Sequence, residues 1–91
     1  MLKLISVNDI DIKNIKQVIE PECQETFINI NYFDKTVKIF TTRATVMKRL
    51  LRKGYKPSKV ETMQGEICSM TFEFDSKDIG NFLRQSIFKY D

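Results

Sequence analysis

The clearest pattern of hydrophobic and polar positions predicts an amphipathic helix in the middle of the chain. Four apolar residues recur at helical spacing and share one side at 100° per residue: Val46, Met47, Leu50 and Leu51. Three basic residues fall on the opposite side: Lys48, Arg49 and Arg52. Thr41 or Thr42 is a suitable N-cap and Gly54 suits the C′ position, so we expect a helix of about three turns between them.

Two β-hairpins are predicted, one on each side of this helix. Runs of β-branched and aromatic residues predict the first pair of strands at 27–33 and 36–41, with Asp34-Lys35 as the turn. The second pair is expected at 59–63 and 66–74, with Gln64-Gly65 as the turn. In the last of these strands apolar residues alternate with polar ones, which is typical of a half-buried strand: Cys68, Met70, Phe72 and Phe74.

Weaker patterns occupy the two ends of the chain. A short apolar alternation at Leu2, Leu4 and Val7 comes first. Asp11 then suits the N-cap of a short helix that ends before Pro21 and has four apolar residues on one face: Ile12, Ile15, Val18 and Ile19. Asp75 or Ser76 suits the N-cap of a last helix, whose buried face we expect to be Ile79, Phe82, Leu83, Ser86 and Ile87.

These elements predict an α+β fold. We expect an antiparallel sheet of four or more strands with the helices on one face, and the other face partly open. The order is a tandem pair of strand–strand–helix units, preceded by a short strand and helix segment, in one domain over residues 1–91. A displacement of 33 residues superimposes four positions of the units, which suggests a structural pseudo-repeat: Ile39, Thr42, Val46 and Leu50 fall on Phe72, Asp75, Ile79 and Leu83.

The composition narrows the chemistry. The 91 residues include no His and no Trp, so the commonest general base and metal ligand is absent. Cys23 and Cys68 lie far apart, outside any CxxC spacing, and we expect reduced thiols in a cytoplasmic protein, with Cys68 in the core. No apolar run is long enough for a membrane span, and the start of the chain does not resemble a signal peptide.

Charge is concentrated in the middle of the chain. The net charge is +3, yet residues 35–59 carry nine Lys and Arg and no acid, and both flanks are net acidic. Like charges on adjacent helical turns repel, which predicts a surface that binds phosphates or an acidic protein. The candidate binding residues are Arg43, Lys48, Arg49, Arg52, Lys53 and Lys56. The alternative is a solvated face that the acidic flanks neutralise in three dimensions.

One face of the first hairpin is mixed in character. It carries three aromatic residues among polar ones: Phe27, Phe33 and Phe40 beside Asn29, Asn31 and Lys38. Such rings can stack on nucleic-acid bases. We expect instead that the first segment of the chain packs over this face and buries it.

No motif indicates catalysis. Carboxylate pairs occur at Glu20/Glu22 and at Glu73/Asp75, but nothing positions a substrate between them. The chain has no Gly-rich phosphate loop, no GxSxG and no Cys/His couple. We therefore expect a protein that is not an enzyme and uses no metal or cofactor.

Three short stretches within about residues 26–88 carry a resemblance to known proteins: Val37-Lys38-Ile39-Phe40-Thr41-Thr42-Arg43, Val46-Met47-Lys48-Arg49-Leu50 and Asp78-Ile79-Gly80-Asn81-Phe82-Leu83. With them the chain resembles small phage and prophage proteins of low-GC Gram-positive bacteria. The resemblance implies a protein that binds and redirects host machinery, as anti-CRISPR proteins of similar size do. The family has no known active site, so it assigns no functional residue.

Three hypotheses follow. The first is a non-enzymatic inhibitor or modulator of a host protein or protein–nucleic acid complex, for example of a Cas nuclease, that binds through the basic helix. The second is an accessory or regulatory protein that contacts DNA or RNA directly. The third is a self-associating structural protein in which a sheet edge pairs with its twin.

Overall fold

The computed structural model describes residues 2–4, 11–84 and 87. These residues form an α+β fold of five strands and two short α-helices, with 3₁₀ turns in the connecting segments. The strands are β1 (Leu2–Leu4), β2 (Thr26–Asn31), β3 (Thr36–Thr41), β4 (Pro57–Met63) and β5 (Glu66–Asp75). The helices are α1 (Ala44–Arg52) and α2 (Ile79–Arg84), and the 3₁₀ turns are η2 (Ile12–Asn14), η3 (Pro21–Cys23) and η4 (Ser76–Asp78).

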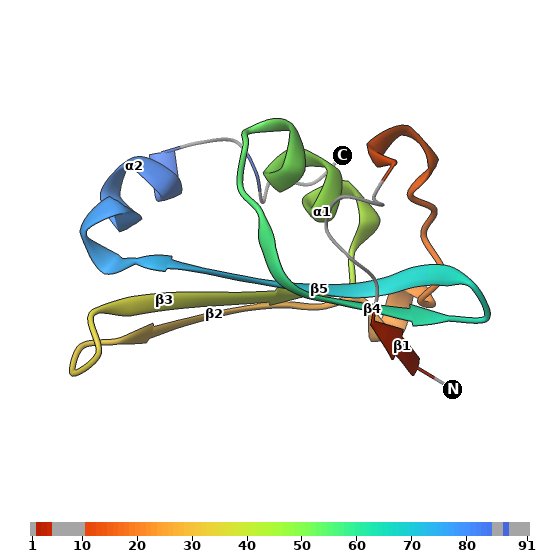
Figure 1. The fold of residues 1–91 in the computed structure, drawn as a ribbon, viewed down its shortest axis with the longest axis horizontal. Helices are drawn as coiled ribbons and strands as arrows, with labels where there is room; N and C mark the ends of the chain where they lie inside the picture. The colour runs from red at the N-terminus through yellow and green to blue at the C-terminus, as the bar shows by residue number, and fades with distance from the viewer. Residues whose placement is uncertain (1, 5–10, 85–86, 88–91) are drawn as a thin grey trace.

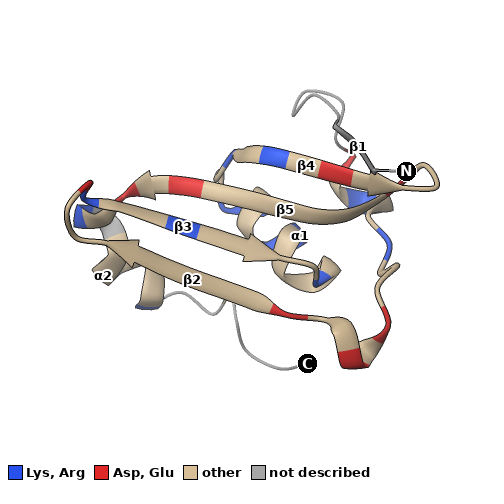
Figure 2. Ribbon diagram, turned by 90° about the horizontal axis from the view of Figure 1, so that it is seen from below, with Lys and Arg blue, Asp and Glu red and all other residues tan. Residues whose placement is uncertain are grey.

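The strands form one antiparallel sheet in the order β1-β4-β5-β3-β2. Both helices and η2 lie on one side of it, as predicted, and the other face is open (Figure 1). Figure 2 views the open face, with the helices behind it. The Gln64-Gly65 turn also forms as predicted, with positive φ at both residues.

The core lies between the sheet and the helices. Val37, Ile39, Met70 and Phe72 from the two central strands are at most 1% exposed. They face Val46, Met47 and Leu50 of α1 and Phe82 of α2, which are just as deeply buried. Tyr55, Phe74 and Phe82 form a ring cluster with centroids 4.9–5.6 Å apart, which ties the loop after α1 to β5 and α2.

The strand–strand–helix order repeats as predicted. Ile39 and Phe72, which a displacement of 33 residues superimposes, lie directly opposite each other in the β3–β5 ladder. A local two-fold axis therefore passes between them. The likeness does not extend to every position, because Leu50 is fully buried in α1 whereas Leu83 of α2 is 55% exposed. The prediction that Leu83 is buried was wrong.

The helix predicted after Asp11 is absent. Asp11 does act as an N-cap, since its carboxylate accepts from the Lys13 N–H at 3.2 Å, but only the 3₁₀ turn η2 follows. The backbone is extended from Ile15, whose side chain is 4% exposed in the core. Ile12, Ile15, Val18 and Ile19 are all β-branched, which weakens a short helix, and the tertiary contacts of this segment favour an extended path.

One further boundary, the end of β2, differs from prediction. Tyr32 and Phe33 lie in the β2–β3 turn, where they are 84% and 95% exposed, and not in a strand. The side chain of Asn31 accepts from the Asp34 N–H at 3.0 Å and so begins the turn earlier than expected. Of the remaining predicted positions, Val7 and Ser86 lie outside the described residues.

Candidate binding surface

The C-terminus of α1 has the local structure that its sequence predicts. Gly54 adopts φ +94°, its N–H donates to the Leu51 carbonyl at 3.0 Å, and the Tyr55 N–H donates to the Leu50 carbonyl at 3.1 Å. This is the Schellman arrangement, with Gly54 at C′. It fixes where the helix ends and where the chain carrying Lys56 leaves it.

The N-terminus of α1 is capped from another part of the chain. The N-cap residue is Arg43, whose side chain makes no capping hydrogen bond. The Ala44 N–H donates instead to the Gln17 side-chain carbonyl at 2.6 Å, across 27 residues of sequence. The prediction that Thr41 or Thr42 is the N-cap was wrong by one or two residues, although Thr41 Oγ1 accepts from the Arg43 N–H at 3.1 Å.

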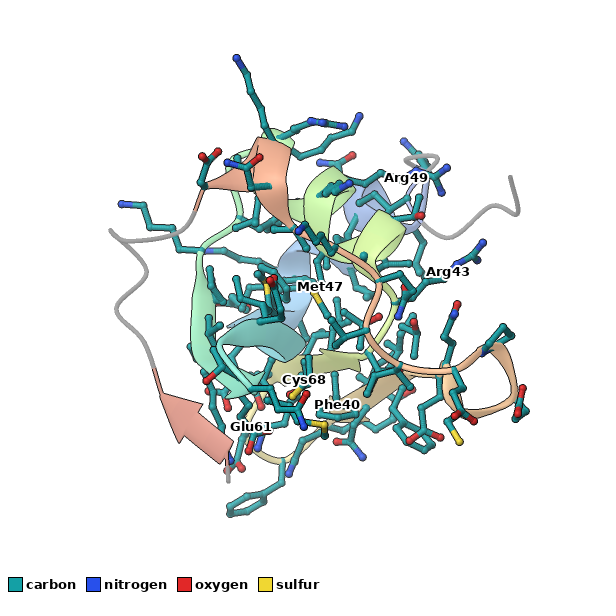
Figure 3. All side chains as sticks on the ribbon, turned by 90° about the vertical axis from the view of Figure 1, so that its right-hand side faces the viewer. Phe40, Arg43, Met47, Arg49, Glu61 and Cys68 are labelled. Carbon is teal, nitrogen blue, oxygen red and sulfur yellow. The ribbon has the colours of Figure 1, made fainter. Side chains whose placement is uncertain are left out.

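The six predicted basic residues gather around α1, and we call them the basic surface: Arg43, Lys48, Arg49, Arg52, Lys53 and Lys56. Arg52, Lys53 and Lys56 are exposed, and the other three are partly exposed. In Figure 3, Met47 lies between α1 and the sheet, whereas Arg43 and Arg49 lie on the outside of the helix layer. The helical spacing thus turns one side of α1 to the core and the basic side to solvent.

Arg49 has a structural contact in addition to its place on this surface. Its Nη1 donates to the Ile87 carbonyl at 3.0 Å, which connects α1 to a residue 38 positions later. Sequence reasoning treated Arg49 as a binding residue only. Part of its guanidinium is engaged within the fold, so the exposed residues Arg52, Lys53 and Lys56 are better placed for a partner.

Four of the six residues of the basic surface are not neutralised by acidic side chains within the part of the chain that the structure describes. Lys48, Arg52, Lys53 and Lys56 form no ion pair there. The negative C-terminal end of the α1 dipole favours Arg52 and Lys53, by about 0.3–1 kcal/mol each at exposed positions. It does not account for Lys48, a turn earlier, or for Lys56, beyond the helix.

On the open face of the sheet, in contrast to the basic surface, basic residues form ion pairs with acidic ones. Lys38 Nζ lies 3.4 Å from Glu73 Oε1, and Lys59 Nζ lies 3.8 Å from Glu61 Oε2. These pairs cancel charge along the strands, where Figure 2 shows positions of both signs. Exposed pairs of this kind add little stability, but they leave no basic track for a phosphate backbone.

The described part of the first segment does not cover the open face. The chain passes through the helix layer at η2, which packs against α1, and then descends beside the sheet to the start of β2. Phe27 is left 58% exposed, with its ring centroid 6.4 Å from that of Phe40. The prediction that the first segment buries these rings was therefore wrong, because Ile15 and Gln17 hold that segment against the other layer.

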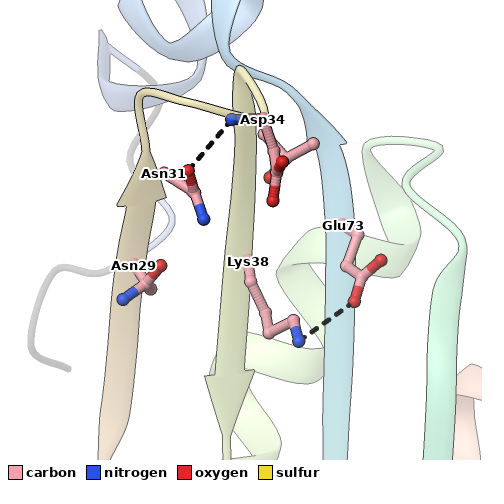
Figure 4. A pocket seen from close by; sticks show the side chains of 6 residues that line it. Asn29, Asn31, Asp34, Lys38 and Glu73 are labelled. Atoms are coloured by element: carbon pink, nitrogen blue, oxygen red, sulfur yellow. Dashed lines mark hydrogen bonds and ion pairs between the residues drawn. The ribbon is translucent and has the colours of Figure 1, made fainter.

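A shallow depression lies on the open face beside these rings. Its volume is about 590 Å³, and six polar residues line it: Asn29, Asn31, Asp34, Thr36, Lys38 and Glu73. Figure 4 shows that the Lys38 ammonium points to the Glu73 carboxylate and that the Asn31 amide turns toward Asp34. The polar groups thus bond to one another. The alternation of Asn with apolar residues in β2 is the sequence signal for this wet face.

The two cysteines differ in environment. Both are free thiols, with Cys23 exposed and Cys68 buried in β5. Burial, and secondly the nearby Glu61 carboxylate, raises the pKa of the Cys68 thiol. Its thiolate is therefore disfavoured, and so is nucleophilic reactivity at this position.

Comparison with known proteins found no match. No protein-family model, no curated protein and no solved structure is significantly similar to this chain. Among the described residues, no helix is both long and apolar enough to cross a membrane.

Proposed function

We propose that this protein is a non-enzymatic binding protein that inhibits or modulates a nucleic-acid-handling complex of a bacterial host cell. The basic surface on α1 makes the contact in this proposal. The observation that carries it is the set of four cations without an ion pair to any described residue: Lys48, Arg52, Lys53 and Lys56. Arg43 and Arg49 flank them.

The chemistry of the basic surface suits an anionic target. The guanidinium of Arg52 offers a planar fork to a phosphate or a carboxylate, and the lysines supply flexible point charges beside it. Such a field also speeds association with a target of opposite charge. The resemblance of short sequence stretches to small phage proteins supports a host complex as the target, and inhibition of a Cas nuclease is one example.

A matched pair of charge-reversal variants tests the site. Arg52→Glu/Lys53→Glu inverts two exposed positions on the basic surface. Lys35→Glu/Lys77→Glu changes the net charge equally at two exposed positions, where the β2–β3 turn meets η4. We expect the first variant to bind its partner at least tenfold more weakly, or about 1.4 kcal/mol, and the second to bind within a factor of about three.

Capture of partners from a bacterial host lysate, with and without nuclease treatment, provides the readout. We expect a protein partner that remains bound after nuclease treatment and is lost with Arg52→Glu/Lys53→Glu. If that variant folds like the wild type and retains every partner, the site assignment is wrong.

Titration of purified DNA and RNA separates direct nucleic-acid binding from this proposal. Neutralisation of about four phosphates by the unpaired cations gives a log–log salt slope of about −3 to −4 on duplex DNA. A slope of that size, together with partner capture that nuclease abolishes, would favour an accessory nucleic-acid-binding protein instead.

A further inference from the structure

The two edges of the sheet are protected differently. The β1 edge is only three residues long, and such a short strand offers little for another chain to pair with. The β2 edge runs for six residues, Thr-Phe-Ile-Asn-Ile-Asn, with no charge and no proline. Its register with β3 is continuous, so no bulge turns it away. Within the described residues, this edge has none of the usual protections against strand addition.

The hydrogen-bond pattern identifies which groups of β2 face outward. The Thr42 N–H donates to the Glu25 carbonyl at 3.0 Å, which makes this a hydrogen-bonded pair of the β2–β3 ladder. Because such pairs alternate in an antiparallel ladder, the odd-numbered residues of β2 bond to β3. The even-numbered residues Thr26, Ile28 and Ile30 therefore direct their N–H and C=O groups away from the sheet.

We propose that β2 pairs with β2 of a second copy of this chain in an antiparallel, two-fold symmetric ladder centred on Ile28. This register places Ile28 opposite Ile28 of the partner subunit, and Thr26 opposite Ile30 of the partner subunit. All three outward-facing residues then bond, which gives about six main-chain hydrogen bonds. A register centred on Asn29 gives about four, because Asn29 directs its amide groups toward β3.

The side chains of β2 are compatible with this pairing. Ile28 is 40% exposed on the helix side, and there the partner subunit's Ile28 covers it. Phe27, on the open face, lies beside the partner subunit's Asn29. Glu25, the charged residue next to the strand, falls opposite the partner subunit's Asn31, so no like charges oppose each other. Pairs of β-branched residues and neutral pairs of this kind favour strand association.

The symmetry also determines where the helices lie. Residues directly opposite each other in a continuous sheet share a face, so the two-fold axis is perpendicular to the sheet. Both α1 helices then lie on the same side of a ten-stranded sheet. The dimer presents two basic surfaces on that side and a doubled open face on the other, and the pairing itself does not depend on what the basic surface binds.

Sedimentation of the full-length chain at about 5–500 μM tests the association. We expect a monomer–dimer equilibrium that Ile28→Lys abolishes. Met63→Lys is the matched control, since Met63 is 42% exposed on β4 and β2 lies at the opposite edge; it should dimerise like the wild type. A wild-type monomer at the highest concentration overturns the proposal and leaves the edge to a strand of another protein. Equal dimerisation of both variants overturns it too.

Cross-linking tests the register without a disruptive substitution. In a Cys23→Ser background, Ile28→Cys places two thiols on Cα atoms about 5.5 Å apart, within the range that a disulfide spans. Ile30→Cys places them about 14 Å apart along the ladder. We expect mild oxidation to link the first variant at least tenfold faster than the second. Equal rates, or no link in either, would contradict the register.

Discussion

The side chain of Gln17 is predicted to stabilise α1 from a distance. Its Oε1 accepts from the Ala44 N–H at 2.6 Å, while its Nε2 donates to the carbonyls of Thr42 at 3.0 Å and Ile19 at 3.3 Å. Ala44 is only 5% exposed, so water is a poor substitute for the lost acceptor. Gln17→Ala therefore removes the N-terminal cap of the helix, a second link between the segments at Thr42 and a local bond to Ile19.

The expected loss follows from these contacts. An N-cap contributes about 1 kcal/mol, and each further hydrogen bond about 0.5–1.5 kcal/mol, with the lower value for the two bonds that are exposed. We expect Gln17→Ala to lower the free energy of unfolding by about 2 kcal/mol. In a domain of this size that corresponds to a fall in Tm of about 8–16 °C.

Urea unfolding followed by far-UV circular dichroism measures the loss. Lys16→Ala, at the exposed neighbouring position, is the control and should stay within about 0.5 kcal/mol of the wild type. Gln17→Glu keeps an acceptor for the Ala44 N–H, but it replaces the Nε2 donor by an oxygen that faces the Thr42 and Ile19 carbonyls, so it should also lose at least about 1 kcal/mol. If Gln17→Ala matches Lys16→Ala, the capping argument is refuted.

Further predictions concern single positions. Gly54→Ala should cost about 1 kcal/mol in urea unfolding because φ is +94°; no loss would refute the left-handed cap. Phe82→Ala should cost about 3–5 kcal/mol by the same measurement, since its ring is fully buried, and a loss below 1 kcal/mol would contradict that packing. A maleimide should label Cys23 at once and Cys68 only on unfolding, as mass spectrometry of the native protein would show; rapid double labelling would contradict the burial. The fold raises the pKa of the Cys68 thiol, so the protonated thiol contributes to the free energy of unfolding at pH values below the unfolded thiol pKa. This contribution is lost as the pH rises through the folded pKa. Urea unfolding at neutral and alkaline pH should therefore show a fall in the free energy of unfolding that is smaller in Cys68→Ala.

Elements with local determinants were predictable from sequence. The core-facing side of α1 follows from its apolar stripe and its C-terminal end from Gly54, and both act within a few residues. The β4–β5 turn follows from Gln64-Gly65, since both positions require positive φ. In both cases the residues that determine the helix end or the turn lie within that helix end or turn.

Elements determined by distant contacts were not predictable in the same way. Residues 12–19 have the spacing of an amphipathic helix, yet burial of Ile15 and the bond from Gln17 to Ala44 favour an extended path. Aromatic β-propensity extends the first strand to Phe33, whereas the Asn31 side chain begins a turn before it. Propensity and periodicity contain no information on such contacts.

The features of the candidate site were likewise predictable where they depend on local sequence and not where they depend on distant contacts. The basic residues are close in sequence on one helix and its flanks, so helical spacing alone is enough to bring them together. The contact of Arg49 with Ile87 spans 38 residues, and sequence gave no signal for it. Exposure of Phe27 depends on which layer the first segment joins, and that was resolved only by the contacts of Ile15 and Gln17.

The distribution of charge makes the two proposals independent of each other. The cations without an ion pair to any described residue lie on the helix layer, the open face has one ion pair across strands and one within β4, and the β2 edge has no charge. Arg52→Glu/Lys53→Glu therefore leaves the edge unchanged, and Ile28→Lys leaves α1 unchanged. A chain that dimerises but binds no anionic partner would refute only the proposed function, and a monomer that binds through α1 would refute only the pairing. The dimer has two basic surfaces on the same side, and they increase the affinity for a target only when that target contacts both of them. If Ile28→Lys lowers the affinity for the partner, the dimer and the binding function are therefore connected.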